Sequence, residues 1–159
     1  MSKFLFVLFF VVLLVSSAFS QKQSKAAKEY INPKSMAKSQ GYSQAIAISG
    51  GKIIFTSGQV ALNAKGELVG AGDLKAQTVQ AFENLKTVLA ASGATFSDVV
   101  KFGYFVKDYD PAKVAVIRSV RDSYLPKVQP PPASTLVGVQ SLFREDVLIE
   151  IEAIAVMPK

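Results

Sequence analysis

The sequence of 159 residues contains neither cysteine nor histidine. Without cysteine, the chain has no disulfide and no thiol nucleophile, so packing or assembly must hold its fold together. Without histidine, it lacks the most common general base and the most common zinc ligand of proteins. Any catalysis must therefore use carboxylates, Lys, Arg, Tyr, Ser, Thr, backbone groups and water.

A long apolar run occurs only at the N-terminus. Lys3 precedes the twelve apolar residues FLFVLFFVVLLV, and Ala18 and Ser20 in the following SSAFS are spaced like a signal-peptidase site. We expect a signal peptide over residues 1–20, cleaved near Ser20-Gln21, and a mature protein that is periplasmic or secreted. The alternative is an uncleaved anchor, although the run is shorter than the roughly 20 residues that span a bilayer.

Positive charge exceeds negative charge, with a formal net charge of +6. Lysines are scattered along the chain, and the only dense basic stretch is KQSKAAK at residues 22–28. We interpret this stretch as a solvated arm rather than a nucleic-acid site, because a phosphate-binding surface needs clustered cations. Residues 21–36 are predicted to form a flexible leader, and residues 37–159 a single domain.

Two segments have the spacing of amphipathic helices. Asp73 is a suitable N-cap for a helix over residues 74–91, and Pro111 is placed to start a second helix that runs to about Leu125. Apolar residues recur at three- and four-residue intervals in both. The predicted buried positions are Val79, Phe82, Leu85, Val88 and Leu89 in the first helix, and Val114, Ile117, Val120 and Leu125 in the second.

Several β-prone runs surround these helices. Residues 45–49 and 52–57 are joined by Gly50-Gly51, which predicts a hairpin because both glycines accept positive φ. Residues 98–108 form another predicted strand, with Val100, Phe102, Tyr104 and Val106 on one side. The run Pro130 to Pro132 cannot pair in a sheet interior, so we expect a stiff arm that leads into a strand over residues 134–139.

The last predicted strand, within residues 146–157, has two different faces. Ile149, Ile151, Ala153 and Ala155 share the face expected to pack under the helices, by the two-residue period. The opposite face carries Leu148, Glu150, Glu152, Ile154 and Val156. Its mixture of carboxylates and large apolar side chains favours contact with a partner chain. The sequence thus predicts an α+β oligomer with a mixed sheet and two helices on one face.

Five stretches, in the order GYSQAI, FTSGQV, FENLKTVLAASGATFSDVVKFGYFVKD, PPPAST and IEIEAIAV, resemble the Rid family of YjgF-type reactive-intermediate deaminases. The resemblance covers roughly residue 37 to the C-terminus. It implies a chorismate-mutase-like fold and a homotrimer with clefts between subunits. It also implies hydrolysis of imines and enamines to a 2-keto acid and ammonia, without metal or cofactor.

The resemblance assigns roles to individual residues. Glu150, the first glutamate of IEIEA, is the predicted catalytic residue that orients water. Tyr42, Ser57 and Gly58 are predicted to bind substrate, although Gln40-Gly41 replaces the Gly-Pro that the family has before the tyrosine. Structural roles stay open for each: a packing residue for the tyrosine, a strand end for the glycine and an intersubunit ion pair for Glu150.

Ser134 departs from the family pattern, because an arginine that clamps the substrate carboxylate is expected there. Ser134 and Thr135 are predicted to contact substrate, but a hydroxyl supplies a neutral bond worth about 1 kcal/mol, against about 1.5–3 kcal/mol for a charge-assisted one. The family's helix asparagine is also replaced by Val116-Ile117. Arg144 is a candidate substitute cation. Ordinary 2-imino-acid deamination is therefore not expected.

The sequence leaves three candidate functions for this protein. The first is a deaminase-like hydrolase, similar to 2-iminobutanoate/2-iminopropanoate deaminases, that acts on a small imine or enamine without a carboxylate. The alternative is a non-catalytic trimer of the cell envelope that binds a small molecule or a protein. RNA cleavage, the third, lacks the usual histidine acid–base pair. No membrane span is expected after signal cleavage, and a nucleic-acid partner is not favoured.

Overall fold

The computed structural model of the chain describes residues 27–127 and 129–158. The predicted signal peptide and its cleavage site lie outside these residues, so export stays a prediction from the sequence. Across the part that the structure describes, no helix combines the length and the apolar character that a membrane crossing requires.

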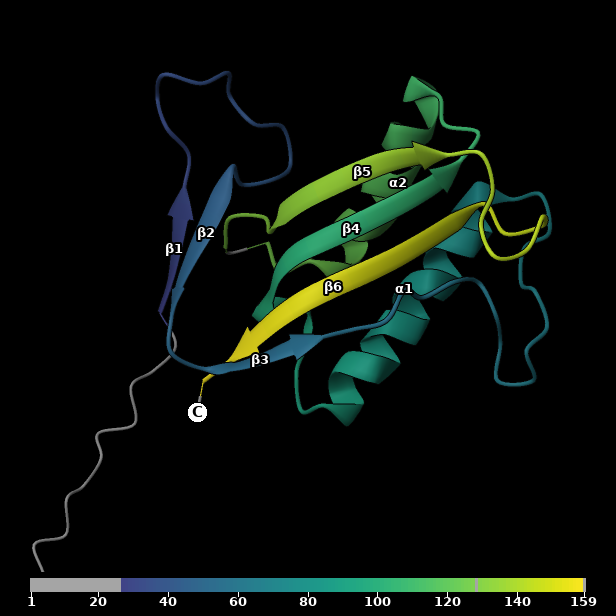
Figure 1. Cartoon of the computed structure of the whole chain (residues 1–159), viewed down its shortest axis with the longest axis horizontal. Helices are drawn as coiled ribbons and strands as arrows, with labels where there is room; N and C mark the ends of the chain where they lie inside the picture. Colours follow the sequence, from purple (N-terminus) through teal and green to yellow (C-terminus); the bar gives the residue numbers. More distant parts are fainter. Residues whose placement is uncertain (1–26, 128, 159) are drawn as a thin grey trace, which may run out of the picture.

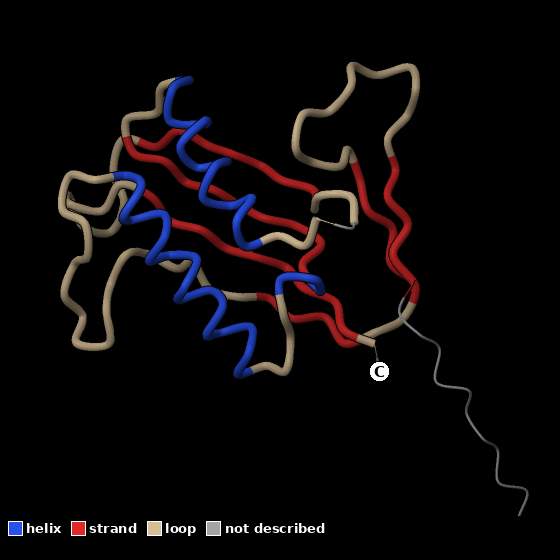
Figure 2. The backbone as a smooth tube through the Cα atoms, turned by 180° about the vertical axis from the view of Figure 1, so that it is seen from behind, coloured by secondary structure: helices blue, strands red, loops and turns tan. Residues whose placement is uncertain are grey.

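The main sheet has four strands in the order β3-β6-β4-β5. They comprise Lys52–Phe55 (β3), Ile149–Met157 (β6), Val99–Lys107 (β4) and Ala133–Val139 (β5). The pairs β3–β6 and β6–β4 are antiparallel, whereas β4–β5 is parallel (Figure 1). The helices α1 (Leu74–Ala91) and α2 (Pro111–Tyr124) both cover the same face of this sheet (Figure 2). The predicted mixed sheet with two helices on one face is confirmed.

Both helices begin where the sequence indicates. The Asp73 carboxylate accepts a hydrogen bond from the Ala76 amide at 3.0 Å, and Asp110 accepts one from the Ala112 amide at 2.7 Å. These bonds satisfy amides that have no partner inside the helix. Pro111 occupies the first helical position, where its missing N–H costs nothing.

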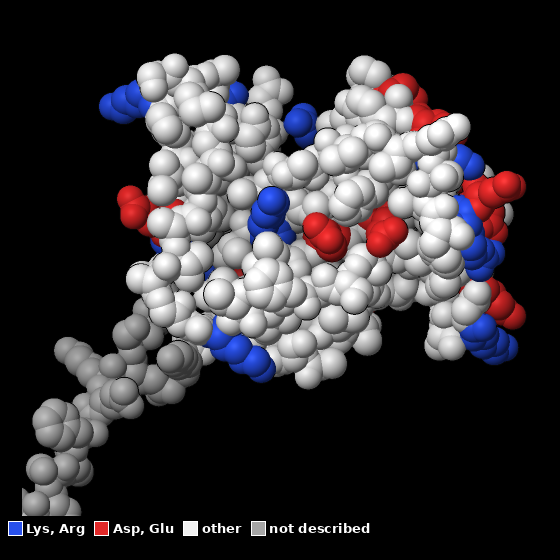
Figure 3. All heavy atoms as spheres, in the orientation of Figure 1, with Lys and Arg blue, Asp and Glu red and all other residues white. Residues whose placement is uncertain are grey.

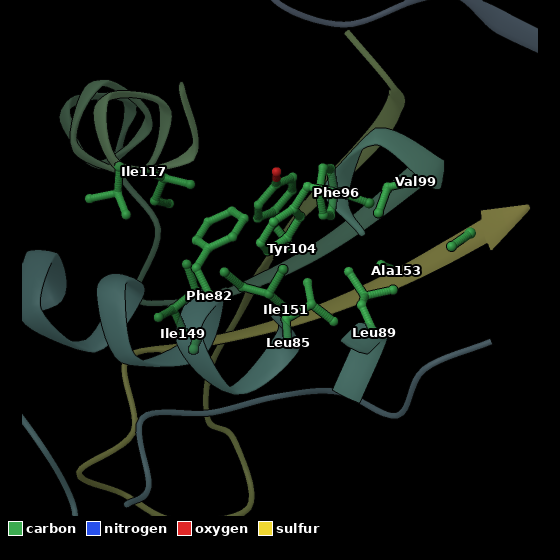
Figure 4. Packing of buried hydrophobic residues seen from close by; sticks show 14 of the residues in the cluster. Phe82, Leu85, Leu89, Phe96, Val99, Tyr104, Ile117, Ile149, Ile151 and Ala153 are labelled. Carbon is green, nitrogen blue, oxygen red and sulfur yellow. The ribbon is translucent and has the colours of Figure 1, made fainter. Parts of the chain in front are cut away.

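The core lies between the two helices and the main sheet. Most of its residues come from α1, β4 and β6 (Figure 4). As predicted, Ile149, Ile151, Ala153 and Ala155 are buried on the helix side. Phe82 of α1 packs against three other aromatic rings, with centroid distances of 5.8 Å to Phe96, 5.9 Å to Phe102 and 5.0 Å to Tyr124. Aromatic contacts of this kind contribute about 0.5–1.5 kcal/mol beyond area burial.

Two predicted core positions differ in the structure. Val79 is 39% exposed, while Gln77 and Thr78 are fully buried. The buried face of α1 therefore includes two polar residues that the spacing of apolar residues did not predict. In β4, the core cluster contains Val99 rather than Val100, because the ladder to β6 shifts register between Val99 and Lys101. Such a bulge reverses the side on which a side chain emerges.

The predicted hairpin across Gly50-Gly51 is wrong. Both glycines do adopt positive φ, 74° and 104°, but the turn separates two strands that pair elsewhere. β2 (Ala45–Ser49) pairs with β1 (Ala27–Ile31), and β3 pairs with β6. β1 itself lies within the residues 21–36 that were predicted to be a flexible leader. Three of its five residues are exposed and none is fully buried, so its sequence AKEYI has no clear apolar face.

Gln77 connects α1 to the segment before β6. Its side-chain amide donates to the carbonyls of Gly70 at 3.1 Å and Asp146 at 2.9 Å, and its side-chain oxygen accepts from the Leu148 amide at 2.8 Å. The side chain is fully buried. One residue therefore bonds three backbone groups. The Gly70 carbonyl also accepts from the Asp73 amide at 3.0 Å, so the Asp146 carbonyl and the Leu148 amide are the two groups that depend on Gln77.

We expect Gln77→Leu to destabilise the protein by at least about 2 kcal/mol, because each backbone group left unpaired costs about 1–3 kcal/mol. Urea unfolding at one fixed protein concentration measures the change. Gln80→Leu on the same helix is the control, since Gln80 bonds only to Asn84. Equal stability losses in the two variants would contradict the role of Gln77.

Candidate functional site

The six predicted site residues fall on two different sides of the sheet. Tyr42 and Ser134 line a cavity on the helix side, between α2, the start of β5 and the loop before β2. Glu150 points to the side that no helix covers, since its neighbours Ile149 and Ile151 face the core. Gly58 lies beside Glu150. The two groups are therefore not brought together within one chain.

Glu150 and Gly58 are in close contact. A Cβ on Gly58 would lie 2.6 Å from Cδ and 2.7 Å from Cγ of Glu150, distances that real Cβ atoms do not show. The carboxylate of Glu150 consequently occupies the space that any other residue at position 58 would fill. The predicted need for glycine at this point is explained by this packing, in addition to the end of β3.

The backbone around Ser57 and Gly58 departs from a regular ladder. The Thr56 amide donates to the Ala153 carbonyl at 3.0 Å, and Gln59 and Ile151 exchange two bonds at 2.8 and 2.9 Å. Ser57 and Gly58 thus oppose the single residue Glu152, which is the arrangement of a bulge. Ser57 itself is exposed at the open face.

The uncovered face carries acidic side chains at its centre. Figure 3 shows them in the middle of this face, with a basic side chain directly beside them and uncharged residues around. Glu150 pairs across the ladder with Phe105, and Glu152 pairs with Gly103. Thr135 on β5 pairs with Gly103 on β4, so Thr135 belongs to this face and not to the cavity that contains Ser134.

The proline arm holds the start of β5 in a fixed place, as predicted. The Ser43 hydroxyl donates to the Pro131 carbonyl at 2.7 Å, and the Ser43 amide donates to the Pro132 carbonyl at 3.2 Å. Ser43 is buried. These two bonds attach the arm to the loop that carries Tyr42, and they bring Tyr42 and Ser134 to the same cavity.

The cavity lining includes polar residues that the sequence reasoning did not select, among them Tyr104 on β4, and Arg118 and Arg121 on α2. Arg121 is 8% exposed and donates from Nη1 to the Gly41 carbonyl at 2.8 Å and from Nε and Nη2 to Asp122. Gly41 has a φ of +77°, and a Cβ there would lie 2.8 Å from Arg121 Nη2. The arginines follow Ile117 and Val120 along the helix, a spacing that could have indicated their place.

Tyr104 is buried to 3% exposure, and its hydroxyl has no hydrogen-bond partner among the described residues. Burial raises the pKa of this phenol well above its usual value; the Arg121 charge opposes the shift and Asp122 adds to it. The hydrogen bonds of Arg121 go to Gly41 and Asp122, and its guanidinium lies close enough to the Tyr104 hydroxyl to oppose the rise in the pKa. Tyr104 therefore keeps a neutral hydroxyl that is buried among the core side chains, as Figure 4 shows.

Arg144, the candidate substitute cation, does not line this cavity. Its guanidinium holds Asp146 through two bonds of 3.0 and 2.6 Å on the loop before β6. This fork lowers the pKa of the Asp146 carboxyl. The side chains of the pair are 37% and 46% exposed, so Arg144 is already matched with a carboxylate on its own loop.

We expect Gly58→Ala to displace the Glu150 side chain, because the new methyl group would overlap it. A crystal structure of the variant should show a different Glu150 rotamer with the strands unmoved. Ser57→Ala is the control and should leave Glu150 in place. An unchanged Glu150 in Gly58→Ala would show that the backbone yields instead.

Tyr104 is expected to stay neutral at about pH 10, where an ordinary tyrosine is half ionised. Because its pKa is raised in the folded state, the stability from this neutral form is present below that pH and is lost as pH rises through the raised value. Ultraviolet titration of wild type and Tyr104→Phe should give the same tyrosinate signal near pH 10. A smaller signal in the variant at that pH would contradict the prediction.

Comparison with known proteins identifies relatives along most of the chain. The sequence matches the family described as Endoribonuclease L-PSP over residues 32–157. It is 40% identical to a RutC family protein of Pyrococcus abyssi over 131 residues, which is 81% of this chain and 97% of that protein. It is 38% identical to the 2-iminobutanoate/2-iminopropanoate deaminase of Escherichia coli over 107 residues, covering 67% of this chain and 80% of the relative.

A solved structure of a Rid family protein from Yersinia pestis has the same fold, with a TM-score of 0.76 and 42% sequence identity. The match covers 82% of this chain and 98% of that one. The four-stranded sheet, its two helices and the order of the motifs thus recur in solved relatives. The chain belongs to the Endoribonuclease L-PSP family, the family of the Rid and YjgF proteins.

Proposed function

We propose that this protein is a homotrimer that hydrolyses small imines or enamines in clefts between its subunits, with Glu150 positioning the attacking water. The observation that carries the proposal is the Glu150 carboxylate, packed over Gly58 at the centre of the uncovered sheet face. Relatives at 36–38% identity that carry the name 2-iminobutanoate/2-iminopropanoate deaminase support the reaction class.

The uncovered face supports assembly. Its exposed apolar side chains include Ile53 at 56%, Phe55 at 73% and Val137 at 41%. A surface of this kind around carboxylates is unfavourable in water and is relieved when a second copy covers it. In a closed ring of subunits, the Glu150 of one chain would face the Tyr42 and Ser134 of its neighbour, which one chain alone keeps apart.

The chemistry needs few groups. Glu150 accepts a proton from water as the oxygen adds to the imine carbon, and the proton passes to the nitrogen. The hydroxyl proton of the resulting carbinolamine is then transferred to its nitrogen as the C–N bond breaks, so ammonia leaves and the carbon becomes a carbonyl. An enamine first gains a proton on carbon and loses one from nitrogen to become the imine. Each step is a proton transfer or an addition, so no electrons have to be supplied from outside.

Ser134 offers one hydroxyl where the resemblance expects a guanidinium. A carboxylate-bearing substrate would therefore need its counter-charge from another residue, whereas an uncharged imine would not. The competing function is a trimer of the same shape that binds a small molecule or a protein without turnover. The family description also names RNA cleavage, for which this chain lacks the usual histidine.

Glu150→Gln is expected to lower ammonia release from freshly generated imines by about 100- to 10,000-fold, the usual contribution of a positioned general base. Imines with and without a carboxylate are tested in parallel. Glu152→Gln is the matched control, because Glu152 lies on the same strand and face one repeat further along. Its activity should stay within a few-fold of wild type.

Two outcomes would overturn the proposal. Activity that survives Glu150→Gln would exclude the water-positioning role. No ammonia from any imine, together with saturable binding of a small molecule, would favour the non-catalytic trimer. Sedimentation of wild type at micromolar concentration tests the assembly, for which a monomer would be the contrary result.

A further inference from the structure

The bulge after β3 lies between two backbone pairs of the ladder to β6. These pairs are Thr56 with Ala153, and Gln59 with Ile151. They are three residues apart on the β3 side but two residues apart on β6, so the β3 side holds one residue more. The extra residue lies in the Ser57-Gly58 segment, next to the Glu150 carboxylate.

At the first of these pairs, a side chain takes the place of a backbone group. The Thr56 amide donates to the Ala153 carbonyl at 3.0 Å, but the Ala153 amide donates to Oγ1 of Thr56, at 2.9 Å. In a regular antiparallel ladder, the backbone carbonyl of the opposite residue accepts this second bond. Ala153 is 2% exposed, so its amide is costly to leave without an acceptor. The Thr56 hydroxyl thus allows the ladder to include an extra residue without an unpaired buried amide.

The extra residue decides on which face of the sheet Gly58 lies. Residues directly opposite each other in a ladder share a face. If the register of β3 and β6 continued unchanged, Gly58 would lie opposite Ile151, whose side chain is buried on the helix side. Instead, Gln59 pairs with Ile151, and Gly58 lies under the Glu150 side chain on the uncovered face. A regular ladder would therefore separate the glycine from Glu150.

Of the two sides of the bulge, β6 is held more firmly. Its side chains that face the helices are buried in the core, and its other edge pairs with β4. The segment after β3 has weaker support: Ser57 is exposed, and its carbonyl accepts a bond from the Gln59 side chain at 3.1 Å. We therefore expect residues 56–58, and not β6, to move when the Thr56 hydroxyl is removed.

We infer that Thr56 is a positioning residue for Glu150. Its hydroxyl maintains the bulge, the bulge keeps Gly58 under the Glu150 side chain, and this contact fixes the direction in which the carboxylate points. Thr56 acts through these two residues and need not touch the substrate. The inference rests on the proposed function, because the direction of Glu150 affects turnover only if Glu150 positions the attacking water.

Thr56→Val removes the hydroxyl and keeps the branched shape of the side chain. We expect kcat for ammonia release from imines to fall about 10- to 100-fold with KM unchanged, because a displacement of about 1 Å at a reacting group can cost that much. Thr56→Ser keeps the hydroxyl and should stay within a few-fold of wild type. Thr78→Val is the matched control, since the buried Thr78 hydroxyl also bonds a backbone group, the Leu74 carbonyl at 2.7 Å, but lies within α1.

Gln59→Leu tests the same bulge from its other end and serves if Thr56→Val folds poorly. It removes the bond to the Ser57 carbonyl and should lower kcat about 3- to 10-fold, again with KM unchanged, as expected for the loss of one neutral hydrogen bond. The melting temperature of every variant is measured beside its activity. If the role of Thr56 were only structural, Thr78→Val would lose as much activity as Thr56→Val at an equal loss of melting temperature.

Crystal structures of wild type and Thr56→Val test the geometry without requiring turnover. The variant should show Ser57 and Gly58 displaced and Glu150 pointing in another direction, with β6 unmoved. An unmoved bulge would overturn the inference, and so would a Thr56→Ser variant as impaired as Thr56→Val. If Glu150→Gln abolishes turnover while Thr56→Val keeps it, the inference fails and the proposed function stands. If Glu150 is displaced in Thr56→Val but wild type releases no ammonia, the positioning role stands and the proposed hydrolysis fails.

Discussion

The side chains of β6 alternate between the two faces of the main sheet. The rest of the structure depends on which set of β6 side chains points toward the helices. Because successive residues of a strand point to opposite sides, burying Ile149 and Ile151 under α1 forces Glu150 onto the uncovered face. A shift by one residue would bury both glutamates and expose the core. The hydrophobic effect that fixes the register of β6 therefore also places the candidate catalytic group, without any contact made for that purpose.

The candidate site residues lie on two opposite faces of the sheet. The helix side offers an enclosed cavity with donors and positive charge, and the open side offers a carboxylate next to a glycine. Neither half would be sufficient for the proposed hydrolysis, which needs a held substrate and a placed water. A subunit interface would bring the cavity of one chain next to Glu150 of another. The same interface would cover the apolar surface around Glu150.

Local signals predicted the helices and the faces of β6 well, because capping residues and short periodic patterns act within a few residues. The pairing of β2 was not predictable in the same way: Gly50-Gly51 indicates a turn, but not that β1, some 18 residues upstream of β2, competes for the strand. Glu150 and Gly58 could be proposed from motif resemblance. The presence of Arg118 and Tyr104 in the lining of one cavity could not, since it depends on how α2 packs over β4 and β5, which short sequence patterns do not determine.

The β1–β2 ribbon has a consequence for motion. It is a two-stranded sheet separate from the main one (Figure 1), and ribbons of two strands are marginal on their own. Its ties to the domain include Ser43 on the proline arm and Lys28 on the Ser97 carbonyl. In hydrogen exchange, its amides should belong to a unit that opens at lower free energy than β6. Gln40 and Tyr42 lie on the loop between these two strands and line the cavity, so opening of the ribbon would displace one wall of the cavity while the core stays folded.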